Sequence, residues 1–245
     1  MTLRCQIAWE SFDPCEYISS NYLVMHPIDA SIIVRVRDFF SDLFGGPFPG
    51  PLEGIDVGAG PNLYPALSML PWCDAVTLVD VAPANVRYLV HQLPSYDLNW
   101  DQFWDLLGAG HAYQFEDPRS RFRQVVTVQS GSLSDVSRSP ARWSMGTMFF
   151  VAESITATPD GFRQSVACFM NALSPGSPFA AAFMEHSRGF RIGENHFPAH
   201  DVDEQEVRAA FADHVEDITI DRVEATEGLK GCTGVLLACG RRRCS

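Results

Sequence analysis

The chain has 245 residues, 46% of them hydrophobic and 20% charged, and its formal net charge at pH 7 is −12. This length and composition fit a single globular domain, 1–245, with a full core. The acidic balance disfavours a nucleic-acid substrate, which would require a basic face, and no apolar run is long enough to span a membrane.

The seven cysteines include no Cys-x-x-Cys pair, so we expect reduced thiols rather than a disulfide framework or a metal site. The segment from Met1 to Arg4 lacks the apolar core of a signal peptide, and the expected location is therefore the cytoplasm. The oligomeric state is left open by the sequence.

Residues 1–45 precede the first predicted strand and carry many aromatic side chains. Asp13 followed by proline predicts the start of a short helix that carries Tyr17, with Tyr22 close behind it. A second helix is predicted over 28–44, where apolar residues recur at helical spacing. The aromatic residues could pack in the core or could form a lid that excludes water from a site.

The segment from Gly54 to Tyr64 reads as a strand, a glycine turn and a helix. Gly58 and Gly60 allow the backbone of the turn to approach a ligand, because glycine lacks a Cβ and tolerates positive φ. Pro61 is expected in the first turn of the following helix. This order of elements predicts a nucleotide-binding corner.

The residues around this corner indicate which nucleotide it binds. A dinucleotide fingerprint would need a third glycine where the chain has Leu63, and no lysine follows as in a P-loop. Asp56 adds a carboxylate that suits a cationic ligand and repels phosphate. The next predicted strand, 75–80, ends in Asp80, twenty residues past Gly60 and in the place of an acid that binds a ribose diol. A ribose, a cationic end and no phosphate together predict S-adenosylmethionine.

The rest of the chain alternates helices and strands, which predicts an α/β fold with a doubly wound, Rossmann-like and mostly parallel sheet. A polar loop is expected over 108–123. The predicted helices cover 83–93, 98–107, 158–173 and 203–213. The further predicted strands cover 124–128, 147–152, 178–184, 215–223 and 234–239.

Ligands in such sheets collect at the carboxyl ends of the strands, where this chain places several polar residues. Glu153 follows the central strand and is either a floor residue of a pocket or a solvated acid. Glu185 and His186 follow the fifth predicted strand and are either a surface pair or the site of proton transfer. Either one could take a proton from a nucleophile, and His186 could do so near neutral pH without any change of its pKa.

Two motifs together resemble the family of nicotinamide, phenylethanolamine and thioether methyltransferases. They are Phe12-Asp13-Pro14-x-x-Tyr17-x-x-x-Asn21-Tyr22 and Asp56-x-Gly58-x-Gly60-Pro61-x-x-Tyr64. The resemblance extends from about Phe12 to Gly240. It implies a class I S-adenosylmethionine-dependent enzyme with an antiparallel final strand in its sheet and an N-terminal helical cap, 1–45. Such enzymes methylate an amine, a pyridine nitrogen or a thioether of a small molecule.

By this resemblance, Tyr17 and Tyr22 would lie near the methionine carboxylate of the cofactor and close over it. Tyr64 would hold the same carboxylate through its hydroxyl group. Gly58 and Gly60 would approach the cofactor through their backbone. Asp56 belongs to the same motif and is counted among the cofactor-binding residues.

The resemblance also assigns the ribose, the adenine and the acceptor. Asp80 would bind the ribose hydroxyls, and Asn85 would add a hydrogen bond there. Where the family carries an acid for the adenine amine, this chain has Gln129-Ser130, and the Gln129 carbonyl can still accept a hydrogen bond. The segment 189–197 resembles the substrate-side hairpin of the family, and its Phe190 and His196, together with Glu153, are the predicted acceptor contacts.

Two other functions stay open. An NAD-dependent oxidoreductase is disfavoured by Leu63, and a non-catalytic partner protein on a methyltransferase fold is suggested by Gln129. A methyltransferase needs no metal, because the sulfonium is already an activated electrophile and the protein has only to align the reactants and exclude water. The aromatic cap favours a flat or aromatic acceptor.

Overall fold

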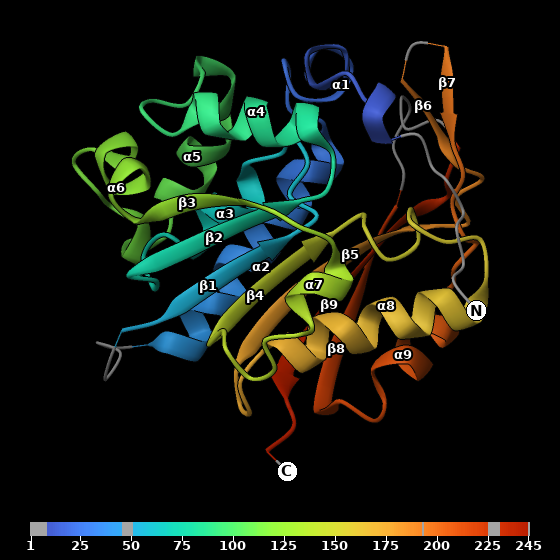
Figure 1. Cartoon of the computed structure of the whole chain (residues 1–245). Coiled ribbons are helices and arrows are strands. Elements are labelled where there is room, and N and C mark those ends of the chain that lie inside the picture. Colours follow the sequence, from blue (N-terminus) through green and yellow to red (C-terminus); the bar gives the residue numbers. More distant parts are fainter. Residues whose placement is uncertain (1–8, 46–50, 193, 225–230, 245) are drawn as a thin grey trace.

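The computed structural model of the chain describes residues 9–45, 51–192, 194–224 and 231–244. The strands of its main sheet are β1 (Glu53–Val57), β2 (Ala75–Asp80), β3 (Val126–Ser130), β4 (Met145–Phe149), β5 (Pro178–Glu185), β8 (Val215–Glu224) and β9 (Gly234–Arg242). They lie in the order β3-β2-β1-β4-β5-β9-β8 (Figure 1). The final strand, β9, runs antiparallel to β5 and β8, and the other neighbouring strands are parallel. The predicted doubly wound α/β sheet is confirmed.

Helices cover both faces of this sheet (Figure 1). Along β5, Phe179, Ala181 and Phe183 join one core cluster, while Ala180 and Ala182 join the other. Successive side chains of a strand point to opposite faces, so the two clusters lie on the two sides of the sheet. The helices are α1 (Pro14–Asn21), α2 (Pro27–Phe44), α3 (Tyr64–Met69), α4 (Pro83–Gln92), α5 (Asp101–Gly108), α6 (Pro118–Val125), α7 (Leu133–Val136), α8 (Pro159–Ala172) and α9 (Glu204–Phe211).

The segment predicted as a cap divides into two parts. Helix α2 buries Ile32, Val36 and Phe40 in the core shared with α3 and α5, so this helix belongs to a layer of the sheet. The short 3-10 helix η1 (Trp9–Ser11) and α1 pack instead near α4. Phe12, which follows η1, joins a small aromatic cluster with the hairpin of β6 (Phe190–Ile192) and β7 (Asn195–Phe197).

Several predicted boundaries are wrong. The expected loop over 108–123 contains most of α6, whose first turn is capped by Asp117, accepting a hydrogen bond from the Ser120 N–H at 2.9 Å. The strand that follows therefore begins at Val126 rather than at 124. Helix α3 begins at Tyr64 rather than at Pro61, so the glycine turn is longer than predicted. None of the described helices has the length and apolar character needed to cross a membrane.

Candidate functional site

A cavity of about 280 Å³ opens at the carboxyl ends of the first four strands. The strand order reverses between β1 and β4, and ligands of doubly wound sheets bind at such a switch point. The glycine turn after β1, the ends of β2 and β4, and the start of α7 line this cavity, which we call the first cavity. Residues of the N-terminal segment and of the hairpin complete the lining, namely Trp9, Phe12, Tyr17 and Phe190.

The glycine turn depends on backbone that other residues rarely adopt. Gly58 and Gly60 have φ of +65° and +57°. A Cβ on Gly58 would lie only 2.5 Å from Cγ2 of Val151, which follows β4. The Gly60 N–H donates to Oδ2 of Asp80 at 2.8 Å, so the turn is tied to the end of β2. The turn thus places its backbone against the cavity as the sequence predicts.

Asp80 presents a carboxylate to the first cavity. Its oxygens accept hydrogen bonds from Gly60 N–H, from Ala82 N–H at 2.8 Å and from Asn85 Nδ2 at 3.2 Å. Burial raises the pKa of Asp80, and these donors oppose that rise because they stabilise the charged form. Oδ1 of Asn85 is buried and has no partner among the described residues. Acceptor groups therefore gather here, which suits a ligand that donates hydroxyl hydrogens, such as a ribose.

A second cavity of about 700 Å³ adjoins the first. Tyr17, Phe150, Ser154 and Phe190 line both, so these side chains form the boundary between the two spaces. The second cavity is more polar in its lining, which includes Tyr22, Asp29, Met184, Arg191 and His196. Its position beside the first cavity makes room for a second molecule next to a bound nucleoside.

Glu153 directly precedes Ser154, one of the residues of this boundary. Its side chain is completely buried, with Oε1 accepting the Met184 N–H at 2.9 Å and Oε2 unpartnered among the described residues. Burial raises its pKa to about 7. The adjacent Ser154 lines both cavities and also has a buried hydroxyl oxygen without a partner in the part of the chain described. The floor role predicted for Glu153 stays a prediction, because its own side chain lines neither cavity.

The model of the NNMT/PNMT/TEMT family matches residues 3–243. The chain belongs to this methyltransferase family. Its cofactor is S-adenosylmethionine. The comparison with curated proteins gave no match.

Solved structures agree with the fold of this methyltransferase family. N-methyltransferase NodS from Bradyrhizobium japonicum, in complex with S-adenosyl-L-homocysteine, is 11% identical over 97% of this chain and 96% of its own, with a TM-score of 0.58. A SAM-dependent methyltransferase from Methanosarcina mazei is 14% identical over 90% and 98%, with a TM-score of 0.56. The 1,6-didemethyltoxoflavin-N1-methyltransferase of Burkholderia thailandensis, with 1,6-didemethyltoxoflavin and S-adenosylhomocysteine bound, is 16% identical over 88% and 80%, with a TM-score of 0.52.

The first cavity accommodates the chemistry of this cofactor. The acceptors at Asp80 and Asn85 match a ribose diol, and the turn at Gly58 and Gly60 leaves its backbone unobstructed by a side chain.

The lining at the end of β3 differs from the prediction. Gln129 and Ser130 are exposed residues within that strand and line neither cavity. The first cavity is lined at this point by Gly131, Ser132 and Leu133. The sequence prediction missed these residues because it ended the strand at 128, two residues before β3 ends.

Asp56 is a buried support of the sheet rather than a ligand contact in this structure. It is 1% exposed, lines neither cavity and accepts a hydrogen bond from the Thr147 hydroxyl at 2.7 Å. Its Oδ2 has no partner among the described residues, and burial raises its pKa to about 8. The cofactor contact predicted for Asp56 therefore has no support from the geometry.

The three predicted tyrosines form one aromatic cluster. The ring centroids of Tyr17 and Tyr22 are 5.7 Å apart, and those of Tyr22 and Tyr64 are 6.1 Å apart. Tyr17 lines both cavities and Tyr22 lines the second, but Tyr64 lines neither. The Tyr64 hydroxyl donates to Oδ1 of Asp29 at 3.1 Å, so in this structure it holds a carboxylate of the chain itself.

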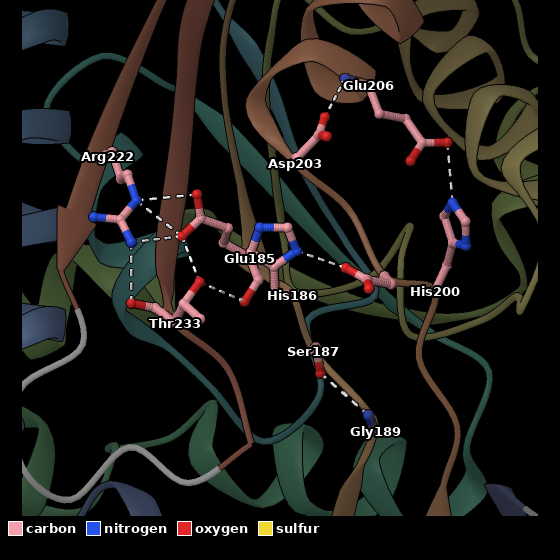
Figure 2. A network of polar contacts seen from close by, with 10 residues as sticks. Glu185, His186, Ser187, Gly189, His200, Asp203, Glu206, Arg222 and Thr233 are labelled. Carbon is pink, nitrogen blue, oxygen red and sulfur yellow. Dashed lines mark hydrogen bonds and ion pairs between the residues drawn. The ribbon is translucent and has the colours of Figure 1, made fainter.

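The two residues predicted to handle a proton, Glu185 and His186, line neither cavity, and both take part in polar contacts within the chain (Figure 2). Glu185 is held by Arg222, whose Nε and Nη2 each lie 2.8 Å from Oε2, and by the Thr233 hydroxyl at 2.6 Å. These hydrogen bonds lower the pKa of Glu185. His186 is 48% exposed and pairs with Asp201 at 2.8 Å, which raises its pKa. His186 is exposed, as the surface-pair alternative expects, whereas Glu185 is buried, and the catalytic assignment of the two residues has no support from this geometry.

Proposed function

We propose that the protein transfers the methyl group of S-adenosylmethionine to a nitrogen atom of a small molecule, an amine or a heteroaromatic base. The observation that carries the proposal is the second cavity, which meets the first at Tyr17 and Phe190 and contains ionisable side chains in an aromatic enclosure. The bound cofactor supplies an electrophilic methyl on a sulfonium. The chain has to align the nitrogen with that methyl and keep water away.

The residues divide between the two cavities in this proposal. Asp80 and Asn85 hold the ribose hydroxyls, the backbone of the glycine turn lies along the nucleoside, and Tyr17 separates the nucleoside from the acceptor. Phe190 and His196 contact the acceptor from the hairpin, which is consistent with their places in the lining of the second cavity. An aromatic acceptor would stack against such rings.

Glu153 is the better candidate for the proton acceptor. Its raised pKa of about 7 means that it can take a proton near neutral pH, whereas Glu185 is committed to Arg222. Glu153 itself lines neither cavity, so it would act through the adjacent Ser154, which lines both cavities and whose buried hydroxyl has no other partner among the described residues. An acceptor with a basic amine must lose a proton before or during transfer, and this requirement gives the buried carboxylate a function.

The test uses matched acceptors that differ in the attacking atom. Wild-type protein is incubated with S-adenosylmethionine and with benzylamine, benzyl alcohol, benzyl mercaptan, nicotinamide or a simple thioether, and S-adenosylhomocysteine is quantified. We expect release with nitrogen acceptors, and a loss of about tenfold or more in Glu153→Gln for a basic amine. Asp160→Asn, an exposed change in the first turn of α8, is the control. Turnover only with the alcohol, the thiol or the thioether would contradict the nitrogen assignment. Binding of the cofactor without turnover of any acceptor would favour the non-catalytic alternative.

A further inference from the structure

The first turn of α2 directs an acidic side chain at the second cavity. Asp29 is only 6% exposed, yet it is part of the cavity lining. Its Oδ1 accepts the hydroxyl hydrogen of Tyr64, a fully buried residue of α3. The other carboxylate oxygen receives no hydrogen bond from a described residue. One oxygen is therefore fixed by the fold, while the second stays available to a ligand.

No positive charge of the described chain neutralises Asp29. The described ion pairs all involve other carboxylates, even though Arg191, His26 and His196 line the same cavity. A carboxylate that is buried without a counter-ion is unfavourable, and burial accordingly raises the pKa of Asp29 to about 7. A cationic group entering the cavity would remove this unfavourable state.

The side chains around Asp29 suit a cation as well. Tyr17 and Tyr22 line the same cavity as Asp29. Aromatic faces attract a positively charged nitrogen, and they exclude water that would weaken an ion pair. The combination of one carboxylate, a fixed hydroxyl partner and aromatic walls resembles the chemistry of an ammonium receptor more than that of a structural hydrogen bond.

We propose that Asp29, positioned by the Tyr64 hydroxyl, is the binding site for a positively charged nitrogen of a ligand in the second cavity. The nitrogen is the α-ammonium group of the cofactor or the protonated amine of the acceptor. The second case rests on the proposed function. In either case Asp29 contacts the ligand, whereas Tyr64 acts by orienting the carboxylate.

Calorimetry with Asp29→Asn separates these two sources. S-adenosylhomocysteine carries the α-ammonium group, and 5′-deoxy-5′-methylthioadenosine shares its nucleoside but lacks the amino-acid end. Benzylamine and benzyl alcohol, titrated into protein saturated with S-adenosylhomocysteine, differ in the charged nitrogen alone. A hydrogen bond to a charged group stabilises strongly enough that we expect a loss of about tenfold or more for the cationic member of one pair. The neutral member should bind as it does to the wild type.

The outcomes are distinct. Selective weakening of S-adenosylhomocysteine assigns Asp29 to the α-ammonium of the cofactor, and selective weakening of benzylamine assigns it to the acceptor. Unchanged affinity of Asp29→Asn for both S-adenosylhomocysteine and benzylamine overturns the proposal, and so does equal weakening within each pair. Because the readout is binding, absence of methyl transfer would refute the proposed function without affecting this result.

Two further variants guard against a general effect on folding. Asp38→Asn makes the same change on an exposed turn of α2 and should leave all four affinities unaltered. Tyr64→Phe keeps the carboxylate but removes the hydroxyl that orients it, so it should weaken the same ligand as Asp29→Asn, by a smaller factor. If Asp29→Asn does not fold, Tyr64→Phe decides: wild-type affinity for both cationic ligands would then overturn the proposal.

Discussion

Replacement of Asp80 by asparagine should remove most of the recognition of the ribose. Each oxygen of this carboxylate faces a backbone donor, Gly60 N–H on one side and Ala82 N–H on the other, both at 2.8 Å. Whichever way the amide of Asp80→Asn is turned, its NH₂ group confronts one of these N–H groups. Hydrogen bonds to a charged acceptor contribute roughly 1.5–3 kcal/mol each. Loss of two such bonds from the ribose diol therefore corresponds to an affinity lower by about 100-fold or more.

The assay compares adenosine with 2′,3′-dideoxyadenosine by calorimetry. Wild-type protein should prefer adenosine, and Asp80→Asn should lose most of this preference because the hydroxyl groups no longer meet a carboxylate. Asp74→Asn, at the opposite end of β2 and 64% exposed, is the matched control and should keep the wild-type preference. If Asp80→Asn discriminates between the two nucleosides as strongly as wild type does, the carboxylate does not bind the ribose.

Three further predictions concern the turn, the buried acid of β1 and the exposed histidine. Gly58→Ala should lower the free energy of unfolding by about 2–5 kcal/mol, because an alanine is strained at positive φ and its Cβ overlaps Val151. Urea denaturation measures this loss. The double variant Gly58→Ala with Val151→Ala should recover the part caused by the overlap and keep the part caused by the positive φ. Asp56 has its pKa raised from 3.8 to about 8, so its contribution to stability is complete below pH 4 and is lost as the pH rises to 8. This difference corresponds to at most about 6 kcal/mol. The free energy of unfolding of Asp56→Asn should therefore exceed that of wild type at pH 9 but not at pH 4. If wild type is the more stable protein at pH 9, the ionised Asp56 carboxylate is accommodated in the folded state at little cost. His186→Ala should change methyl transfer less than about twofold, because the side chain points to Asp201, and a loss of 100-fold would reinstate the catalytic assignment.

Local signals were sufficient to predict most of the fold. Strand β2 has the predicted bounds. Helices α2 and α8 begin within one residue of the prediction, because each of these two helices combines apolar residues at helical spacing with a proline in its first turn. The prediction of a loop over 108–123 was wrong because α6 has few apolar residues and therefore lacks the apolar periodicity that indicates a helix. Its Asp117-Pro118 start is the same signal as Asp13-Pro14 at α1, and it would have located the helix.

The site was predictable where a contact is made by neighbouring elements of the corner. Gly58 and Gly60 lie in the turn after β1, Asp80 ends the neighbouring strand β2, and Asn85 lies in the first turn of α4; all four line the first cavity. Contacts between distant segments were not predictable. Asp29 and Tyr64 are 35 positions apart, and a resemblance that reserves the Tyr64 hydroxyl for the cofactor gives no sign that the chain supplies its own carboxylate there.

The acids at strand ends show why residue type alone does not decide which carboxylate is free to act on a ligand. Glu185 ends a strand that pairs with β9, so the neighbouring antiparallel strands bring Arg222 and Thr233 to its carboxylate and neutralise it. Glu153 follows β4, beside the switch point, where the described chain brings a backbone N–H to only one of its oxygens. The partner of a carboxylate is decided by which strands are adjacent. Glu153 therefore keeps one oxygen without a partner among the described residues, whereas Glu185, beside the antiparallel strands, becomes part of the framework.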